Sequence, residues 1–484
     1  MIWTAATCLL LALEGIALSS GKPPEASLAP PPPDAPRPSA AEQPILLPQM
    51  EVERLLWQER PSRATDAALE LLAAYPDRPE VRNLAGACLL RTFRPLEAVE
   101  AWRPLLENRR WRMRALERMV ASYLAAGRDD EAASLLLRHA PLEREAFRQA
   151  AGLYVRVFPN GPRRIAALEI LARRPDTARQ AEEELRASRH FMGYPASVRS
   201  TGQGFPHRAK IREVYREPSV RVRLDDSRKA WVAFDTGAGF LLNRDIVRKL
   251  DLEPVATILK QGLGYKGPAE RDVYSLSKLD IGGLAFSNVR TVVNRRDSEF
   301  RSNKAGYMGL ELLRRYVVLY DRRGGVLEIW PEGTPAADIL GEPGVAMPVM
   351  WSRNRPLVPL RIQDRDSYPA LFDTGAALTF LDQEKADVIG ARANLGKYRN
   401  RIVEGFSGAF SLRVAEQVDL RFAGEEFNLR RLHVGEVPQV FDMPVYAVIG
   451  RDLLNRYRIV IDGPGSEITV APYSWAAPET PAGS

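Results

Sequence analysis

The tripeptide Asp-Thr-Gly occurs twice in the chain, each time directly after an apolar run that ends in phenylalanine. The two copies are Asp235-Thr236-Gly237 and Asp373-Thr374-Gly375. Hydrolysis of an amide by water needs one group that takes a proton from the water and another that supplies a proton to the substrate. Two aspartates that share a site can do both, because adjacent carboxyls do not ionise together easily and one keeps its proton. Asp235 and Asp373 are therefore the candidate catalytic pair.

The two tripeptides belong to a longer duplication. Gly264-Tyr265-Lys266-Gly267 is echoed by Gly405-Phe406-Ser407-Gly408, and Gly309-Leu310-Glu311-Leu312-Leu313 by Gly450-Arg451-Asp452-Leu453-Leu454. The aspartates are offset by 373 − 235 = 138 residues, and the later elements by 405 − 264 = 450 − 309 = 141, so one three-residue insertion keeps the series in register. A single Asp-Thr-Gly is more often an ordinary turn. Two copies in register predict two similar lobes that each supply one aspartate.

The residues beside each aspartate are expected to support the pair. Gly237 and Gly375 let the main chain approach the opposite lobe where a side chain would collide. Thr236 and Thr374 carry hydroxyls that can hydrogen-bond across the interface and hold both loops rigid.

The two glycine-bearing turns are predicted to be tips of β-hairpins that close over a bound peptide. The residues that form these tips are Gly264, Tyr265 and Gly267 in the first copy and Gly405, Phe406 and Gly408 in the second. Tyr265 and Phe406 are the expected contact residues, and the two tips differ because only Tyr265 carries a hydroxyl.

Both copies have the alternation of apolar and polar residues that is typical of β-strands, as in the segment 220–224. The duplicated unit predicts two β lobes, at residues 215–331 and 354–472. A connection that contains glycine and proline, around residues 341–348, is expected to join them.

From about residue 215 to 472 the chain resembles the retropepsin and pepsin clan of aspartic proteases, and specifically a fused bacterial retropepsin-like pair. The resemblance lies in an apolar residue before Asp-Thr-Gly-Ala and in a later apolar pair followed by glycine, here Tyr307-Met308-Gly309 and Val448-Ile449-Gly450. It implies a bilobal all-β acid-protease fold, Asp235 and Asp373 as catalytic aspartates, a protein or peptide substrate and no cofactor. Two positions depart from the family pattern. Ala377 stands where the arginine equivalent to Arg451 usually finds an acidic partner, and the first lobe has Leu310 in place of that arginine.

Residues 50–190 are rich in Ala, Leu, Arg and Glu at helical spacing. Ala98, Ala132 and Ala166 recur every 34 residues, and the segment 121–132 is similar to the helix-turn-helix of a tetratricopeptide repeat, with Gly127 ending the first helix. The expected fold is therefore multidomain: an α-helical repeat followed by the β lobes. Irregular helix pairs are the alternative. Helical repeats offer concave surfaces, which makes a protein partner or the substrate itself their expected ligand.

The first residues predict export or attachment to a membrane. An apolar run from Ile2 to Leu13 followed by small residues indicates a signal peptide or short anchor over residues 1–20, although no positive charge precedes it. Residues 21–49 are rich in proline and are expected to form a stiff linker without helix or strand. An exported, periplasmic or membrane-anchored protein is expected, with a tether at the N-terminus.

Charge and composition exclude several other classes. The net charge of +7 is spread along the chain with no basic block, which argues against a nucleic-acid partner. Two cysteines, Cys8 and Cys88, exclude a disulfide framework, and the four histidines have no metal-ligand spacing, so no metal is expected. The sequence has no glycine-flanked serine elbow and no phosphate-binding loop.

Two alternatives remain open from the sequence. The β lobes could bind peptide without cleaving it, which would make the protein a helical-repeat scaffold or adaptor. The protein could also cut itself at residues 199–207, which are expected to form an exposed loop between the helical region and the lobes.

Overall fold

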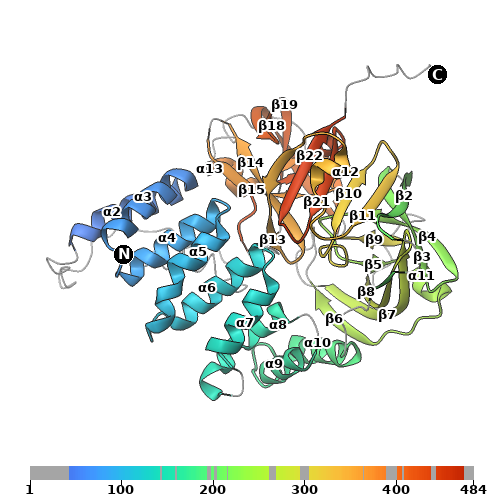
Figure 1. Cartoon of the computed structure of the whole chain (residues 1–484), viewed down its shortest axis with the longest axis horizontal. Coiled ribbons are helices and arrows are strands. Elements are labelled where there is room, and N and C mark those ends of the chain that lie inside the picture. The colour runs from blue at the N-terminus through green and yellow to red at the C-terminus, as the bar shows by residue number, and fades with distance from the viewer. Residues whose placement is uncertain are drawn as a thin grey trace.

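A computed structural model of the protein describes residues 43–141, 144–158, 161–192, 198–200, 204–214, 216–260, 269–294, 305–363, 365–388, 401–405, 408–435, 437 and 443–473. Helices occupy the described part of residues 43–190, and strands dominate from residue 198 to 472 (Figure 1). The expected class, a helical region followed by all-β lobes, is confirmed. No helix among the described residues is long and apolar enough to cross a membrane.

The helical region consists of consecutive helices and two short 3-10 turns. Its helices are α2 (Gln43–Trp57), α3 (Pro61–Ala74), α4 (Pro79–Arg91), α5 (Pro95–Trp102), α6 (Arg112–Ala125), α7 (Asp129–His139), α8 (Ala151–Val157), α9 (Pro162–Ala172) and α10 (Ala178–His190), and its 3-10 turns are η1 (Arg103–Glu107) and η2 (Glu145–Ala150). Four of these helices begin with proline, whose fixed φ suits the first turn and whose missing N–H has no partner there anyway.

The 34-residue spacing places its three alanines near the start of α5, α7 and α9. Ala98 and Ala132 are fully buried, whereas Ala166 is exposed and its neighbour Ala167 is buried instead, so the buried face moves by one residue in the third helix. Gly127 adopts a left-handed φ of 74° directly after α6, which confirms that it ends this helix.

The prediction of a linker up to residue 49 is wrong over its last part. Helix α2 already begins at Gln43 and contains Pro44 and Pro48. Proline is tolerated in a first turn, and the later residues Val52, Leu55 and Leu56 are buried in a cluster with α3 and α4. The burial of these side chains outweighs the local cost of the prolines.

The first lobe contains one long antiparallel hairpin and several shorter strands. Its elements are β1 (Val198–Ser200), β2 (His207–Val214), β3 (Glu217–Leu224), β4 (Arg228–Phe234), β5 (Leu241–Leu242), α11 (Arg244–Lys249), β6 (Ala256–Lys260), β7 (Ala269–Ile281), β8 (Leu284–Asn294), β9 (Gly306–Met308), β10 (Val317–Asp321) and β11 (Val326–Trp330). This lobe therefore extends before residue 215. An exposed loop was expected at residues 199–207. Both ends of this segment belong to strands instead, since β1 pairs with β8 and His207 is buried in β2.

The second lobe repeats this arrangement. After α12 (Ala336–Leu340) and β12 (Val345–Pro348) its elements are β13 (Met350–Ser352), β14 (Arg355–Ile362), β15 (Ser367–Phe372), β16 (Phe380–Asp382), α13 (Gln383–Val388), β17 (Arg401–Gly405), β18 (Gly408–Phe422), β19 (Glu425–Gly435), β20 (Ala447–Ile449), α14 (Arg451–Leu454), β21 (Tyr457–Asp462) and β22 (Glu467–Pro472). In both lobes the strand before the aspartate runs parallel to the strand before the motif glycine, as β4 with β9 and β15 with β20.

The two lobes share a sheet. Strand β10 of the first lobe pairs antiparallel with β21 of the second, and β12 from the expected connection adds to the edge beside β22. The segment 341–348 is thus partly a strand and not only a loop. One hydrophobic core, which includes Phe234 and Phe372, continues through both lobes.

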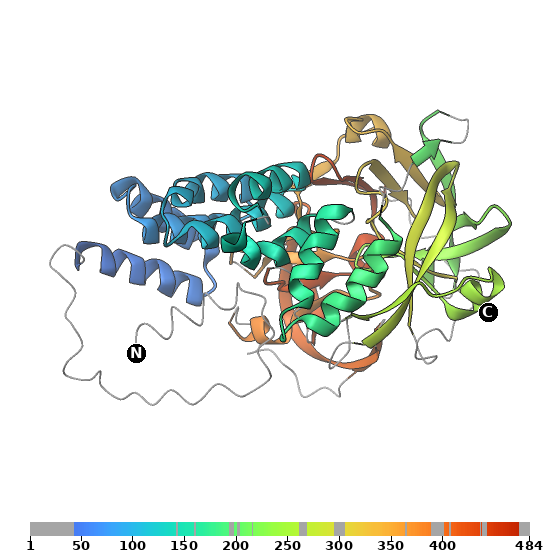
Figure 2. The same ribbon diagram turned by 90° about the horizontal axis from the view of Figure 1, so that it is seen from below.

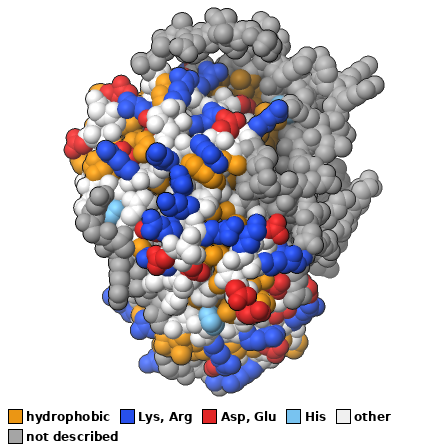
Figure 3. Space-filling view, turned by 90° about the vertical axis from the view of Figure 1, so that its right-hand side faces the viewer, with side chains coloured by type: hydrophobic (Ala, Val, Ile, Leu, Met, Phe, Trp, Pro, Cys, Tyr) orange, Lys and Arg blue, Asp and Glu red, His pale blue; other side chains and the backbone are white. Residues whose placement is uncertain are grey.

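Basic side chains are scattered among hydrophobic and acidic ones over the described part of the face that forms the right-hand side of Figure 1 (Figure 3). Exposed Arg212 on β2 stacks on Trp231 with its guanidinium carbon 4.1 Å from the ring centroid. Acidic residues are interspersed, since Arg208 pairs with Glu328 at 2.7 Å.

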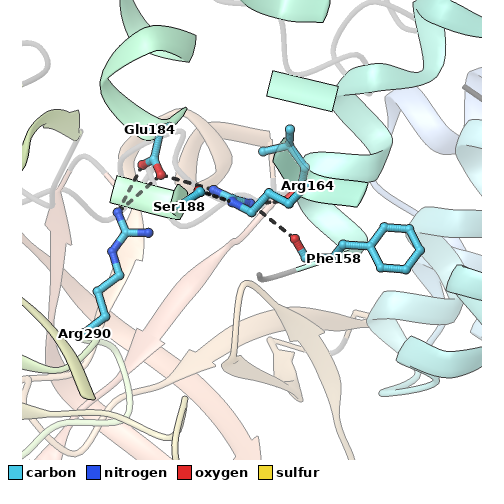
Figure 4. Close-up of polar contacts among 6 residues, drawn as sticks. Phe158, Arg164, Glu184, Ser188 and Arg290 are labelled. Carbon is cyan, nitrogen blue, oxygen red and sulfur yellow. Dashed lines mark hydrogen bonds and ion pairs between the residues drawn. The ribbon is translucent and has the colours of Figure 1, made fainter. Parts of the chain in front are cut away.

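The helical region packs on both lobes, and its last helices lie against the strands of the first (Figures 1 and 2). Phe191, after α10, is buried with Leu241 and Ile258 of the first lobe. Glu184 of α10 lies between Arg164 of α9, at 3.1 Å, and Arg290 of β8, at 3.2 Å (Figure 4). One carboxylate therefore joins two helices to the first lobe.

A buried glutamate joins the helical region to the second lobe. The carboxylate of Glu59, which follows α2, accepts a hydrogen bond from the Tyr446 hydroxyl. It also forms an ion pair with Lys385, with Nζ at 3.4 Å. Its main-chain carbonyl accepts from the Tyr368 hydroxyl at 2.8 Å. The helical region is consequently fixed to each lobe by apolar and by polar contacts.

Candidate active site

Each Asp-Thr-Gly loop is held by the strand that precedes a motif glycine. The Asp235 amide donates to the Met308 carbonyl, and the Asp373 amide donates to the Ile449 carbonyl, each at 3.0 Å. Both loops follow strands whose last residue, phenylalanine, is fully buried. The apolar pair before each glycine thus has a physical role, which is to supply the strand against which the aspartate loop is aligned.

The structure brings the two predicted aspartates together at the interface of the lobes, each carboxyl beside the glycine of the opposite loop. A β-carbon at Gly237 would lie 2.5 Å from Asp373 Oδ2, and one at Gly375 would overlap the Asp235 carboxyl group. Only glycine leaves room at these two positions. The expected close approach of the glycines to the opposite lobe is confirmed.

Thr236 and Thr374 form a reciprocal set of hydrogen bonds across the interface, as predicted. The Thr236 hydroxyl donates to the Phe372 carbonyl at 2.5 Å, and the Thr374 hydroxyl donates to the Phe234 carbonyl at 2.9 Å. Each hydroxyl also accepts from the amide of the opposite threonine at 3.1 Å. Both side chains are buried, so these bonds act in a surrounding of low dielectric and fix one loop relative to the other.

The two carboxyls have unequal surroundings. Asp373 Oδ1 accepts from the amides of Gly375 at 2.8 Å and Ala376 at 3.0 Å, whereas Asp235 Oδ1 accepts from that of Gly237 at 2.9 Å. Burial, followed by the charge and the hydrogen bond of Asp373, raises the pKa of Asp235 well above its usual value. Because a shared proton stays on one carboxyl while the other is charged, the pair has a general acid and a general base at once.

Sequence reasoning missed two charged residues beside the pair. Arg355 Nε donates to the Gly237 carbonyl at 2.6 Å, and its guanidinium interacts electrostatically with both aspartates. Glu217 adds to the negative potential at Asp235 and hydrogen-bonds with Tyr307. The offset of 355 − 217 = 138 puts them at equivalent positions of the two lobes, each directly before a proline. That shared offset was the available signal.

The arginine without its usual acidic partner binds main-chain carbonyls instead. Arg451 donates through Nε to the Ala376 carbonyl at 3.3 Å and through Nη1 to the Arg216 carbonyl in the other lobe. Ala377 has no acidic group to offer, but these two carbonyls provide Arg451 with hydrogen-bond partners. In the first lobe the equivalent Leu310 is buried in the hydrophobic core, so the two lobes are not symmetric here.

Each lobe has a β-hairpin where a substrate-covering tip was expected. Strands β17 and β18 pair up to Gly405 and Gly408, and β6 and β7 pair up to Lys260 and Ala269. Four of the predicted tip residues lie outside the described residues: Gly264, Tyr265, Gly267 and Phe406. Within the described ranges no group of three or more His, Cys, Asp or Glu side chains could hold a metal ion.

The paired lobes, the aspartates at their interface and the glycines beside them define an aspartic protease-like domain. Residues 220–312, which include Asp235, match the family model of the aspartyl proteases. Among solved structures, an aspartic proteinase from Irpex lacteus is similar at a TM-score of 0.39 with 13% identity, over 55% of this chain and 97% of that one. A likeness of this size carries no argument of its own. No curated protein matches the sequence.

Proposed function

We propose that the protein is an aspartic endopeptidase that hydrolyses peptide bonds with a water held by Asp235 and Asp373. The observation that carries the proposal is that the two Asp-Thr-Gly loops, 138 positions apart in the sequence, place each aspartate carboxyl against the glycine of the opposite loop. The match of the first lobe to the aspartyl protease family supports it.

The chemistry follows from the shared proton. The ionised carboxyl takes a proton from water as the water oxygen attacks the peptide carbonyl carbon, and the protonated carboxyl gives its proton to the carbonyl oxygen. The carbon–nitrogen bond then breaks as a proton passes to the departing nitrogen. Each step uses only the two carboxyls and water, so no covalent intermediate with the protein forms and no cofactor takes part.

An extended segment of a protein or peptide is the proposed substrate. It would lie across the aspartates beneath the hairpins β6–β7 and β17–β18. The proposed contact residues are the predicted tip residues, Gly264, Tyr265 and Gly267 in one lobe and Gly405, Phe406 and Gly408 in the other. We further propose that the helical region, as a tetratricopeptide-like array, recruits this substrate or a partner protein. Its position against both lobes supports this role. Recruitment predicts a lower KM for a protein substrate than for a short peptide with the same cleaved bond.

We also propose export or membrane anchoring of the protein. The support is the apolar run in residues 1–20, which precedes the described part of the chain. Cell fractionation of the full chain and of a variant without residues 1–20 tests it, because the proposal requires that only the full chain leaves the cytoplasm or enters the membrane fraction.

The decisive experiment is digestion of a peptide library by the full chain, compared with Asp235→Asn and Asp373→Asn. Each variant should lose cleavage by about a hundredfold or more, because one member of the acid–base pair is gone. The control is Asp251→Asn, a change at an exposed residue with a left-handed φ of 52°, which asparagine tolerates. Cleavage by either active-site variant at the wild-type rate contradicts the proposal. Absence of cleavage by the wild type, with peptide still bound, would favour the scaffold alternative.

A further inference from the structure

The turn between α6 and α7 docks closely at the seam of the two lobes. The Ala126 carbonyl accepts a hydrogen bond from Ser466 Oγ at 2.8 Å, and Ser466 Oγ accepts from Trp351 Nε1 at 3.0 Å. A β-carbon at Gly127 would lie 2.6 Å from Ser466 Oγ, so the main chain of the turn itself is in contact with the second lobe. Figure 1 shows α6 beside β13, and these two elements are in contact.

One guanidinium at this seam connects three parts of the molecule. Arg314, which follows the motif glycine of the first lobe, forms an ion pair with Asp129 at the start of α7. Its Nη1 donates to Asn354 Oδ1 of the second lobe at 2.8 Å, and its guanidinium carbon lies 5.4 Å from the centroid of the Trp351 ring. Arg314 therefore links the helical region to the hairpin that joins β13 and β14.

That hairpin leads directly to the aspartates. Its tip consists of Arg353 and Asn354, both with left-handed φ of 51° and 65°, and Ser352 pairs with Arg355 across it. Arg355 Nε donates to the Gly237 carbonyl at 2.6 Å, and the Gly237 amide donates to Asp235. Arg355, the residue after the tip, thus connects this hairpin to the loop that carries Asp235.

The second copy of the duplication has a different residue at the position of Arg314. Arg314 corresponds to Asn455 in the second copy of the duplication, since 455 − 314 = 141. The arginine occurs in the copy that faces the helical region, where it forms the ion pair with Asp129.

We propose that Asp129 is a positioning residue for the catalytic pair: through Arg314 and Asn354 it holds the hairpin tip, so that Arg355 fixes Gly237 between the two aspartates. The helical region then forms part of the catalytic framework in addition to any recruitment of substrate. This inference rests on the proposed endopeptidase function.

The test is Asp129→Asn in the full chain, assayed with a short peptide that the proposed protease cleaves. We expect kcat to fall about ten- to a hundredfold, since a small misplacement of catalytic groups has effects of this size, while KM stays within about twofold. Asp129→Glu, which retains the charge, should recover most of the loss. The control Asp130→Asn removes the adjacent exposed carboxylate from the same first turn of α7 and should leave kcat unchanged.

A second measurement does not depend on activity. Hydrogen exchange of the peptide that spans residues 234–240 should be faster in Asp129→Asn than in the wild type and unchanged in Asp130→Asn. The Thr236 amide donates across the interface to the Thr374 hydroxyl and the Gly237 amide donates to Asp235, so a displaced loop loses protection at these amides. Equal kcat and equal exchange in both variants would overturn the inference, as would a change confined to KM. A wild-type protein without any cleavage would instead remove the proposed function, and the exchange experiment would still decide whether Asp129 positions the loop.

Discussion

Thr236 and Thr374, 138 residues apart in the sequence, each donate a hydroxyl hydrogen to the carbonyl before the opposite aspartate and accept from the opposite amide. Four hydrogen bonds between two buried side chains and four main-chain groups hold the loops together. The relative position of the aspartates is thus set by groups that do not themselves react.

Thr236→Val should destabilise the protein by about 2–6 kcal/mol, because it leaves the Phe372 carbonyl and the Thr374 amide buried without their partner and each costs about 1–3 kcal/mol. Thr374→Val should have an effect of similar size. Urea unfolding measures both, and Thr236→Ser, which keeps the hydroxyl, is the control. An unchanged free energy of unfolding in Thr236→Val would show that the interface does not depend on these bonds.

Gly375→Ala should reduce cleavage by about a hundredfold, because its β-carbon overlaps the Asp235 carboxyl and displaces it from Asp373. Peptide hydrolysis measures the effect. Gly152→Ala in α8 is the matched control, since nothing lies within 4 Å of its added β-carbon. Similar activity of the two variants would contradict the close approach of the lobes.

The raised pKa of Asp235 predicts the pH dependence of cleavage. The pair is active while the two carboxyls together hold one proton. Because the pKa of Asp235 is raised above the usual 3.8, Asp235 keeps this proton to a higher pH, and kcat should fall only as the pH rises through the raised pKa. The negative charge of Glu217 contributes to the raised pKa, hence Glu217→Gln should lower it and move the alkaline limb of the kcat profile to lower pH. Glu213→Gln, at an exposed glutamate paired with Arg322, should leave the profile in place. A shift of the alkaline limb to higher pH in Glu217→Gln would have the wrong sign.

Tyr446→Phe should weaken the attachment of the helical region to the second lobe. It removes the hydroxyl that donates to the buried carboxylate of Glu59, at an expected cost of about 1–3 kcal/mol. Urea unfolding of this variant is to be compared with that of Tyr75→Phe, a change in the loop after α3. Equal stability of the two variants would mean that the Glu59 contact does not stabilise the docked arrangement.

The duplication made the centre of the site predictable from the sequence. A constant offset relates Asp235 to Asp373, and the threonine and glycine contacts follow from the need to bring two copies of one loop together. Arg355 and Glu217 were not predicted, because a single charged residue outside a repeated motif has no periodic pattern. Their equivalence appears only when the same offset is applied to residues that differ.

Other features depended on contacts between distant parts of the chain. Glu59 and Tyr446 are 387 residues apart, and no local pattern predicts that they meet in a buried contact. The first part of α2, residues 43–49, was missed because its prolines were weighed without the burial of Val52 and Leu55, which tertiary packing supplies. Propensity is a weak guide wherever such packing decides the outcome.

Glu217 and Arg355 occupy matching positions in the two lobes and have opposite charges. Two identical chains could not arrange this, since every substitution would then occur on both sides of the catalytic pair. With both lobes encoded in one polypeptide, each flank can change independently of the other. The electrostatic potential therefore differs between the two sides of the catalytic pair. A peptide bound across the aspartates in one direction is not equivalent to the same peptide bound in the opposite direction.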